Sequence, residues 1–128
     1  MYNINEDLDY FTREEFACQY TGENEISDRL LLKLDLLRAR CGFPFVITSG
    51  YRDPSHPEEA RKTKPGTHAQ GIAADIKVAN GAQRALVVKH ALELGFNGIG
   101  VAKTFVHVDT RPSTLVMWTY WWLFSNLH

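Results

Sequence analysis

The sequence predicts one domain of helices and short strands, built on a sheet with one apolar face and one polar face. Three observations support this prediction. Segments with apolar residues at helical spacing are interleaved with short apolar or alternating runs. The apolar fraction of 45% and the charged fraction of 23% are typical of a globular protein. The length of 128 residues suits a single domain, residues 1–128, that buries its own core.

Three helices are predicted from their start and stop signals. Residues 12–15, Thr-Arg-Glu-Glu, fit a capping box in which a hydroxyl precedes a carboxylate by three positions, so a short helix begins there. Ser27 is a suitable N-cap for the second helix, whose leucines recur at helical spacing until Gly42 ends it. The third helix is predicted over residues 81–94, with one apolar side that packs on the sheet.

Four short strands are predicted between and after the longer helices. Residues 44–49 and 72–78 form two of them, and residues 99–101 and 105–110 form a closing pair joined by a turn. Residues 50–71 contain three prolines, three glycines and many charges, so they are predicted as a long loop. A loop of about 20 residues inside a compact domain is usually functional or disordered.

Two of these strands carry a residue that can bind a metal opposite an apolar row. In residues 72–78, Asp75 lies on the face opposite the apolar row, because side chains alternate along a strand. In residues 105–110, His107 and Asp109 share the face opposite the two valines. The sheet is therefore predicted to have a core face and a site face.

His68, Asp75 and His107 are the candidate metal ligands. His68 ends the long loop and Asp75 follows seven residues later, with Gly71 allowing a sharp turn between them. A lone histidine is usually a surface or hydrogen-bonded residue, but a carboxylate without a partner is costly to bury in an apolar strand. Asp75 therefore requires a cation. Three nitrogen or oxygen donors with an open fourth position are the arrangement of catalytic zinc.

These residues stand in a pattern that resembles a known family. His68 and Asp75 are preceded by Ser-Gly-Tyr-Arg at residues 49–52 and followed by Phe-Val-His-Val-Asp at residues 105–109. The pattern resembles the zinc D-Ala-D-Ala carboxypeptidases, of the superfamily that contains lysostaphin-type peptidases and the hedgehog domain. It is most similar to small phage and bacterial murein peptidases. The resemblance covers residues 10–118, nearly the whole chain.

The resemblance implies a fold, a cofactor and a reaction. The fold would be α+β, a mainly antiparallel sheet with flanking helices and the zinc site on one face. His68, Asp75 and His107 match the family's three ligands of one zinc ion, and Arg52 matches an arginine that stabilises substrate or the charged intermediate. The substrates would be short peptides with D-amino acids in peptidoglycan, cut by an endolysin-like or carboxypeptidase-like hydrolysis.

The general base departs from the family pattern. Many relatives carry an acidic residue three positions before the last ligand, where this chain has Thr104. Asp109 lies two residues after His107 on the same strand face, about 7 Å along the strand. It is expected either to take the proton of the attacking water or to hold His107 in place. Glu58 and Glu59 in the long loop are rival bases.

Charge and hydropathy argue against two classes of function. The formal net charge of −1, with no basic block, argues against nucleic-acid binding. The longest apolar stretch, residues 115–127, is interrupted by Ser125 and Asn126 and falls short of the ~20 residues of a membrane helix.

Cys18 and Cys41 are expected to be reduced, buried thiols. The protein is expected to be a monomer.

The N-terminus predicts where the protein is made. Residues 1–11 are acidic and lack the apolar core of a signal peptide. The protein is therefore expected to be made in the cytoplasm and to act at the cell envelope. Its small size suits a phage lysis or virion protein better than a secreted host enzyme.

Other residues give weaker indications. His56 lies in the long loop, where it is either exposed or lines the cleft; His90 is explained by its helix, and His128 is terminal. Residues 119–128 are expected to form a flexible aromatic tail. Its aromatic side chains, together with Trp118, would pack on the core, cap the site or contact envelope sugars.

Two other functions remain open at this point. One is a zinc-binding module without hydrolase activity, which Thr104 at the usual base position favours. The other is a phage structural protein with a relic of the site, which predicts weak zinc binding. For the leading function, the cleaved bond could be at D-Ala-D-Ala ends, in L-Ala-D-Glu stems or in cross-links.

Overall fold

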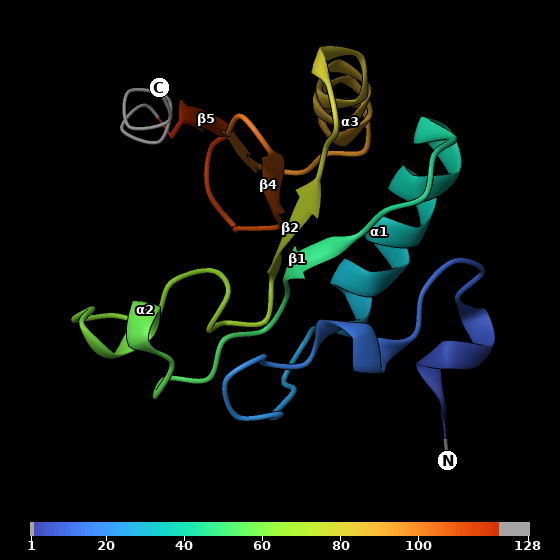
Figure 1. The fold of residues 1–128 in the computed structure, drawn as a ribbon. Coiled ribbons are helices and arrows are strands. Elements are labelled where there is room, and N and C mark those ends of the chain that lie inside the picture. The colour runs from blue at the N-terminus through green and yellow to red at the C-terminus, as the bar shows by residue number, and fades with distance from the viewer. Residues whose placement is uncertain (1, 121–128) are drawn as a thin grey trace.

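A computed structural model describes residues 2–120 (Figure 1). No helix in this part of the chain has the length and hydropathy needed to cross a bilayer. The elements in chain order are the 3-10 helices η1 Ile4–Asp7 and η2 Arg13–Phe16, helix α1 Asp28–Cys41, strand β1 Ile47–Ser49, helix α2 Pro57–Ala60, strand β2 Ala73–Lys77, helix α3 Gly81–Glu93, and strands β3 Gly98–Val101, β4 Phe105–Asp109 and β5 Val116–Thr119.

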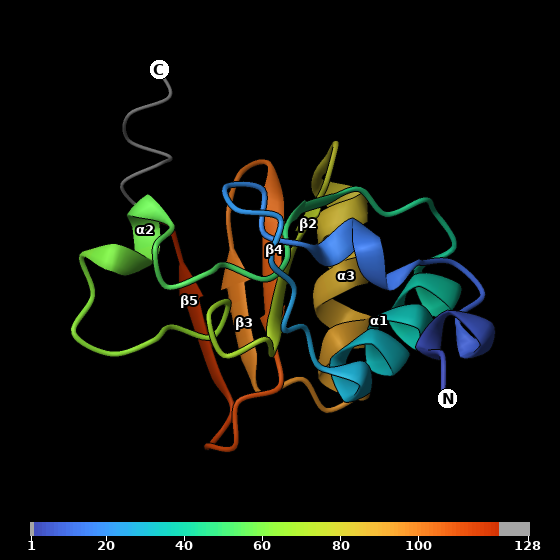
Figure 2. The same cartoon turned by 90° about the horizontal axis from the view of Figure 1, so that it is seen from below.

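The five strands form one sheet in the order β1-β2-β4-β3-β5. Neighbouring strands are antiparallel from β1 to β3, and β5 lies parallel to β3 at the edge. Helices α1 and α3 lie on one side of the sheet, whereas α2 and the long loop lie on the other side (Figures 1 and 2). The predicted α+β class with a mainly antiparallel sheet is therefore confirmed.

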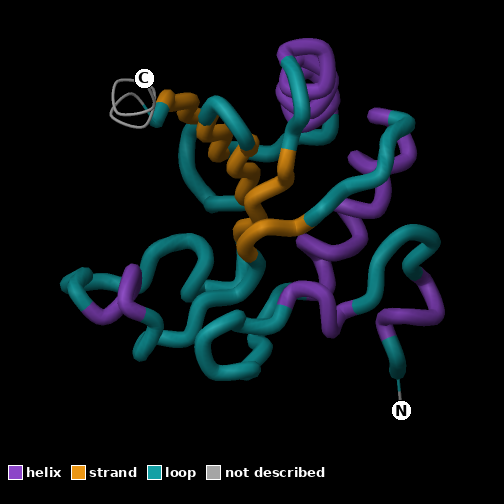
Figure 3. The backbone as a smooth tube through the Cα atoms, in the orientation of Figure 1, coloured by secondary structure: helices purple, strands orange, loops and turns teal. Residues whose placement is uncertain are grey.

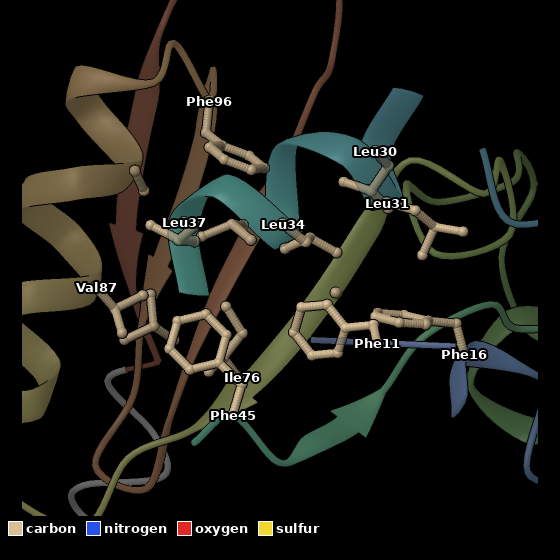
Figure 4. Packing of buried hydrophobic residues seen from close by; sticks show 14 of the residues in the cluster. Phe11, Phe16, Leu30, Leu31, Leu34, Leu37, Phe45, Ile76, Val87 and Phe96 are labelled. Carbon is tan, nitrogen blue, oxygen red and sulfur yellow. The ribbon is translucent and has the colours of Figure 1, made fainter. Parts of the chain in front are cut away.

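The core lies between the sheet and α1 and α3 (Figure 4). Leu30, Leu31, Leu34 and Leu37 of α1 have no exposed surface, whereas Leu36 is exposed, and the apolar row of β2 and β4 faces the buried leucines. The Ser27 hydroxyl accepts a hydrogen bond from the Leu30 amide, and Gly42 ends the helix with φ of 75°. Each buried leucine contributes about 1.5–3 kcal/mol. The core residues include Leu30, Leu31, Leu34, Leu37, Ile76, Val106 and Val108.

Three details differ from the prediction. The strand predicted over residues 44–49 is shorter, because only Ile47–Ser49 pair with β2 and the exposed Val46 contributes only its carbonyl. The predicted loop contains α2, a single turn too short for any periodicity to indicate (Figure 3). The capping box at Thr12 is present, but the helix it begins is a 3-10 helix.

Strand β5 was not predicted. Residues 116–119 show no regular alternation of apolar and polar side chains, and Trp118 and Thr119 belong to the predicted aromatic tail. In the structure they lie parallel to β3, with Trp118 beside Gly100. The part of the predicted tail after residue 120, with His128, lies outside the described residues.

Candidate metal centre

Strand pairing lines up the site across the polar face of the sheet. Asp75 of β2 is the ladder partner of His107 of β4, and His107 is the partner of Gly100 of β3. Gly100 is in turn the partner of Trp118 of β5, and Ser49 of β1 is the partner of Asp75. Five strands therefore contribute one residue each to a single row. The alternation of side chains points this row away from the core.

His68 reaches the row from the loop before β2. Its Nδ1 lies 2.8 Å from the carbonyl oxygen of Gly50. Gly50 packs so closely on Phe16 that a Cβ there would lie 2.6 Å from the Phe16 carbonyl oxygen. At the end of the loop, Gly71 has φ of 74° and packs against the backbone of Glu25. On both sides of His68, a glycine thus allows the backbone to pack closely against another segment of the chain.

The hydrogen bonds fix which atoms of the histidines face each other. A carbonyl oxygen only accepts, so Nδ1 of His68 carries the proton and Nε2 keeps its lone pair. Nε2 of His107 lies 2.7 Å from Oδ2 of Asp109 and donates to it, which leaves the lone pair on Nδ1. Both lone pairs are directed toward Oδ1 of Asp75. Three acceptor atoms therefore converge on one point.

The separations of these atoms fit a tetrahedral metal site. Nε2 of His68 lies 3.2 Å from Oδ1 of Asp75, and Nδ1 of His107 lies 3.1 Å from the same oxygen. The two nitrogens are 3.2 Å apart. Ligands about 2.0–2.1 Å from a tetrahedral zinc ion are about 3.3 Å from one another. Acceptors this close require a cation among them, and three nearly equal separations suit a metal ion better than one proton.

The site is buried and keeps its carboxylate ionised. The exposed fractions of His68, Asp75 and His107 are 5%, 6% and 3%. Burial raises the pKa of Asp75, but the two histidines beside its carboxylate outweigh burial and hold the pKa well below its usual range. Burial lowers the pKa of His107, but the neighbouring carboxylates of Asp109 and Asp75 outweigh burial and raise the pKa. The negative charge of the site thus favours any cation placed there.

A comparison with protein families supports the same conclusion. The family model described as Peptidase M15 matches residues 9–109. The chain belongs to the peptidase M15 family. The resemblance to zinc carboxypeptidases in the sequence is thereby confirmed, and the matched segment includes His68, Asp75 and His107. A comparison with curated proteins found no match.

Asp109 of this M15 family member is held within the sheet face. It has no exposed surface, and Gly98 of β3 leaves the space that its carboxylate fills. Besides His107, it binds Arg111 through the amide at 3.0 Å, Nε at 2.9 Å and Nη2 at 2.7 Å. Burial raises the pKa of Asp109, but these bonds outweigh it and hold the pKa well below its usual range. This environment suits the second of the two expected roles, the orientation of His107.

Arg52 lies between two buried carboxylates. Its Nη2 is 3.7 Å from Oδ2 of Asp75, and its Nη1 is 3.8 Å from Oε2 of Glu59. Its Nε donates to the Ser49 hydroxyl at 3.1 Å. The Arg52 guanidinium thus approaches the candidate metal ligand Asp75 from the loop side.

The two rival bases have different environments. Glu59 is 5% exposed, and its oxygens accept from Lys62 Nζ at 2.8 Å and the Gly66 amide at 3.0 Å. Glu58 is half exposed, pairs with Arg61 at 2.7 Å and lines the cleft above the metal centre. Thr104, at the position where many M15 peptidases have an acid, is exposed and contributes its carbonyl to the Val78 amide.

An open cleft of about 550 Å³ contains the three candidate ligands. Four cationic side chains line it, and within residues 2–120 Glu58 is the one lining carboxylate besides Asp75. An aromatic wall of the cleft is formed by Phe105, Trp118 and Tyr120. Trp118 and Tyr120 come from the aromatic segment for which a place at the site was one of three expectations. The cations are Arg52, Arg61, Lys62 and Arg111.

The remaining predicted residues lie apart from the ligands. His56 caps α2, where its Nδ1 accepts from the Glu58 amide at 3.0 Å. His90 of α3 pairs with Glu93, with 2.6 Å between His90 Nδ1 and Glu93 Oε1. Cys18 and Cys41 are buried and free. None of these residues adds to the metal centre.

Proposed function

We propose that this protein is a zinc metallopeptidase that hydrolyses peptide bonds in the stem or cross-link of peptidoglycan. The observation that carries the proposal is the convergence of three acceptor atoms, on His68, Asp75 and His107, at 3.1–3.2 Å from one another. Membership of the M15 family supports peptide hydrolysis. The four cationic side chains of the cleft suit the carboxylates that peptidoglycan stems carry.

The residues around the ligands have separate roles in this proposal. Bound zinc would polarise the scissile carbonyl and lower the pKa of a water to about 7. Asp109 holds the Nε2 proton of His107, so Nδ1 stays available as a ligand. Arg52 presents a fixed positive charge where the carbonyl oxygen becomes negative during attack.

Glu58 is the residue we assign as proton acceptor. Asp109 and Glu59 each have both oxygens engaged, and Asp109 has no exposed surface. Glu58 is half exposed and lines the cleft, so it can exchange its Arg61 partner for a water or substrate proton. Replacement by Gln is expected to remove turnover and to leave zinc binding unchanged. Retained turnover in Glu58→Gln would reject the assignment.

The place of action follows from the proposed substrate. Peptidoglycan lies in the cell envelope, so we propose that the protein acts there as a phage lysis or virion protein and works as a monomer. Lysis of cells from outside by added protein, with release of stem peptides, would support this role.

Digestion of purified peptidoglycan tests the proposed function. Wild-type protein, His68→Ala and the control His90→Ala would be incubated with murein, and zinc would be measured on each protein. Wild type and His90→Ala are expected to hold one zinc ion and to release peptides whose masses identify the bond. His68→Ala is expected to lose both properties. Zinc binding without fragments from wild type would reject hydrolysis.

A zinc-binding module without hydrolase activity is the second candidate. Thr104 at the usual base position favours it, and so does the complete engagement of Asp109 by His107 and Arg111. It predicts one tightly bound zinc ion and no murein fragments in the same experiment. A relic structural protein predicts weak zinc binding in wild type and His68→Ala alike.

A further inference from the structure

Tyr120 shares the cleft with the metal ligands, although neither the sequence motifs nor the family match includes it. It follows β5, and its amide donates to the Val101 carbonyl at 3.1 Å, so the strand pairing continues to this residue. Together with His68, Asp75 and His107 it lines the same cavity. Its phenol is a hydrogen-bond donor that none of the roles above uses.

Gly100 makes room for the Tyr120 ring over the site. A Cβ on Gly100 would lie 2.8 Å from Cε2 of Tyr120 and 2.7 Å from Nε1 of Trp118. Gly100 is also the ladder partner of His107. Directly opposed residues in a sheet have Cα atoms about 4.5–5.5 Å apart. The Tyr120 ring therefore lies above the strand position next to the candidate ligand His107.

Neighbouring aromatic rings hold Tyr120 in this position. Its ring centroid lies 5.0 Å from that of Phe105, one site-face position before His107 on β4. Trp118 lies 6.4 Å away in an edge-on arrangement and itself packs 5.1 Å from the His107 ring. Arg111 stacks on the Trp118 ring, with its Cζ atom 4.9 Å from the ring centroid. The wall is thus a packed unit that leaves the phenol little freedom to move away.

The surroundings keep the phenol protonated. Burial raises the pKa of Tyr120, and the charges of Asp75 and Asp109 raise it further; together they outweigh the neighbouring Trp118 side chain and the charge of Arg52, which lower it. A tyrosine with a pKa above its ordinary value is an O–H donor at neutral pH.

We propose that Tyr120 is a catalytic residue whose hydroxyl donates a hydrogen bond to the oxygen of the scissile carbonyl as that oxygen gains charge. This inference rests on the proposed peptidase function. Arg52 approaches the ligands from the long loop beside β2, and Tyr120 approaches from β5 at the other edge of the row. A substrate carbonyl over the metal centre would then lie between a guanidinium and a phenol. The tyrosine donor stabilises charge and takes no part in proton abstraction.

The variant Tyr120→Phe tests the inference because it retains the ring and removes the donor. Its kcat on the peptide that wild type cleaves is expected to fall on the order of 10²-fold, as for one lost oxyanion donor, with little change in KM. Zinc content is expected to equal that of wild type. Tyr10→Phe is the matched control, because Tyr10 is exposed and packs on Arg38 away from the cleft.

A binding measurement gives a readout independent of turnover. A phosphinate analogue of the cleaved bond carries a charged oxygen in place of the carbonyl, and its affinity for the zinc-loaded proteins would be measured by calorimetry. Tyr120→Phe is expected to bind it at least 10-fold more weakly than wild type and Tyr10→Phe. Equal kcat or equal phosphinate affinity in Tyr120→Phe and wild type would overturn the inference while leaving the peptidase function intact. Absence of turnover in wild type would instead reject the proposed function.

Discussion

Replacement of Asp109 by Asn should weaken zinc binding although Asp109 is not a ligand. The two side chains have the same shape, so the change removes a charge without creating a cavity. Asp109 now accepts from His107 Nε2 at 2.7 Å and from Arg111 at three positions. An Asn oxygen turned toward His107 would place its NH2 group against the Arg111 donors, and the reverse rotamer would oppose the His107 proton.

The size of the effect follows from these contacts. Loss of a partner that orients a metal-bound histidine typically costs about 10–100-fold in metal affinity. That range corresponds to about 1.4–2.8 kcal/mol. Because Asp109 is fully buried and its partner Arg111 is 28% exposed at the side chain, a fall in thermal stability should accompany the loss.

Chelator competition would measure the zinc affinity of wild type, Asp109→Asn and the control Asp53→Asn. Asp53 is a loop carboxylate that binds Ser55 and has no contact with the ligands. The control should match wild type. An Asp109→Asn protein that binds zinc within twofold of wild type would refute the idea that Asp109 orients His107.

Three other changes test the scaffold around the site. Gly98→Ala would place a methyl group against the Asp109 carboxylate and should lower both the zinc affinity and the melting temperature. Gly81→Ala is the control, because there is space for a methyl group at Gly81, and it should lower neither. Equal behaviour of the two variants would contradict this packing. Leu34→Ala should cost about 2–5 kcal/mol in denaturant unfolding, since Leu34 is completely buried, and a cost below 1 kcal/mol, roughly, would be inconsistent with that burial. Burial raises the pKa of Glu59, but the hydrogen bonds from Lys62 and Gly66 and the charge of Arg52 outweigh burial and lower the pKa below its ordinary 4.5. Ionised Glu59 therefore stabilises the folded protein above that pH, and this stabilisation is lost as the pH falls. Wild type should therefore lose more stability than Glu59→Gln between about pH 5 and pH 3, and parallel pH profiles would contradict the assignment.

The arrangement of the candidate metal ligands could be predicted in part, because local pattern and geometry agree there. Alternation in two strands placed Asp75 and His107 on the same face, and antiparallel pairing then made them ladder partners. The core helix could be predicted for the same reason, since its leucines follow one helical period from Ser27 to Gly42. In both cases the face that a residue occupies follows from local spacing, which is visible in the chain.

Features that leave no pattern in the local sequence could not be predicted. Strand β5 is held by parallel pairing to β3, which leaves no periodic trace in a short apolar segment. The ion pairs of Arg52 with Glu59 and Asp75 form across a loop whose path the sequence does not determine. One signal was available: the Gly98-Ile99-Gly100 segment places two glycines in a strand, which often marks the close approach of another group.

Restoration of the metal-free protein by zinc tests the central claim most directly. The protein would be stripped of metal with a chelator, and peptide release from purified peptidoglycan would be followed as zinc is added back. The account predicts no release without metal and full recovery at one zinc ion per chain, with no recovery in His107→Ala. Equal release by the stripped protein, or zinc uptake by wild type without any release, would contradict it.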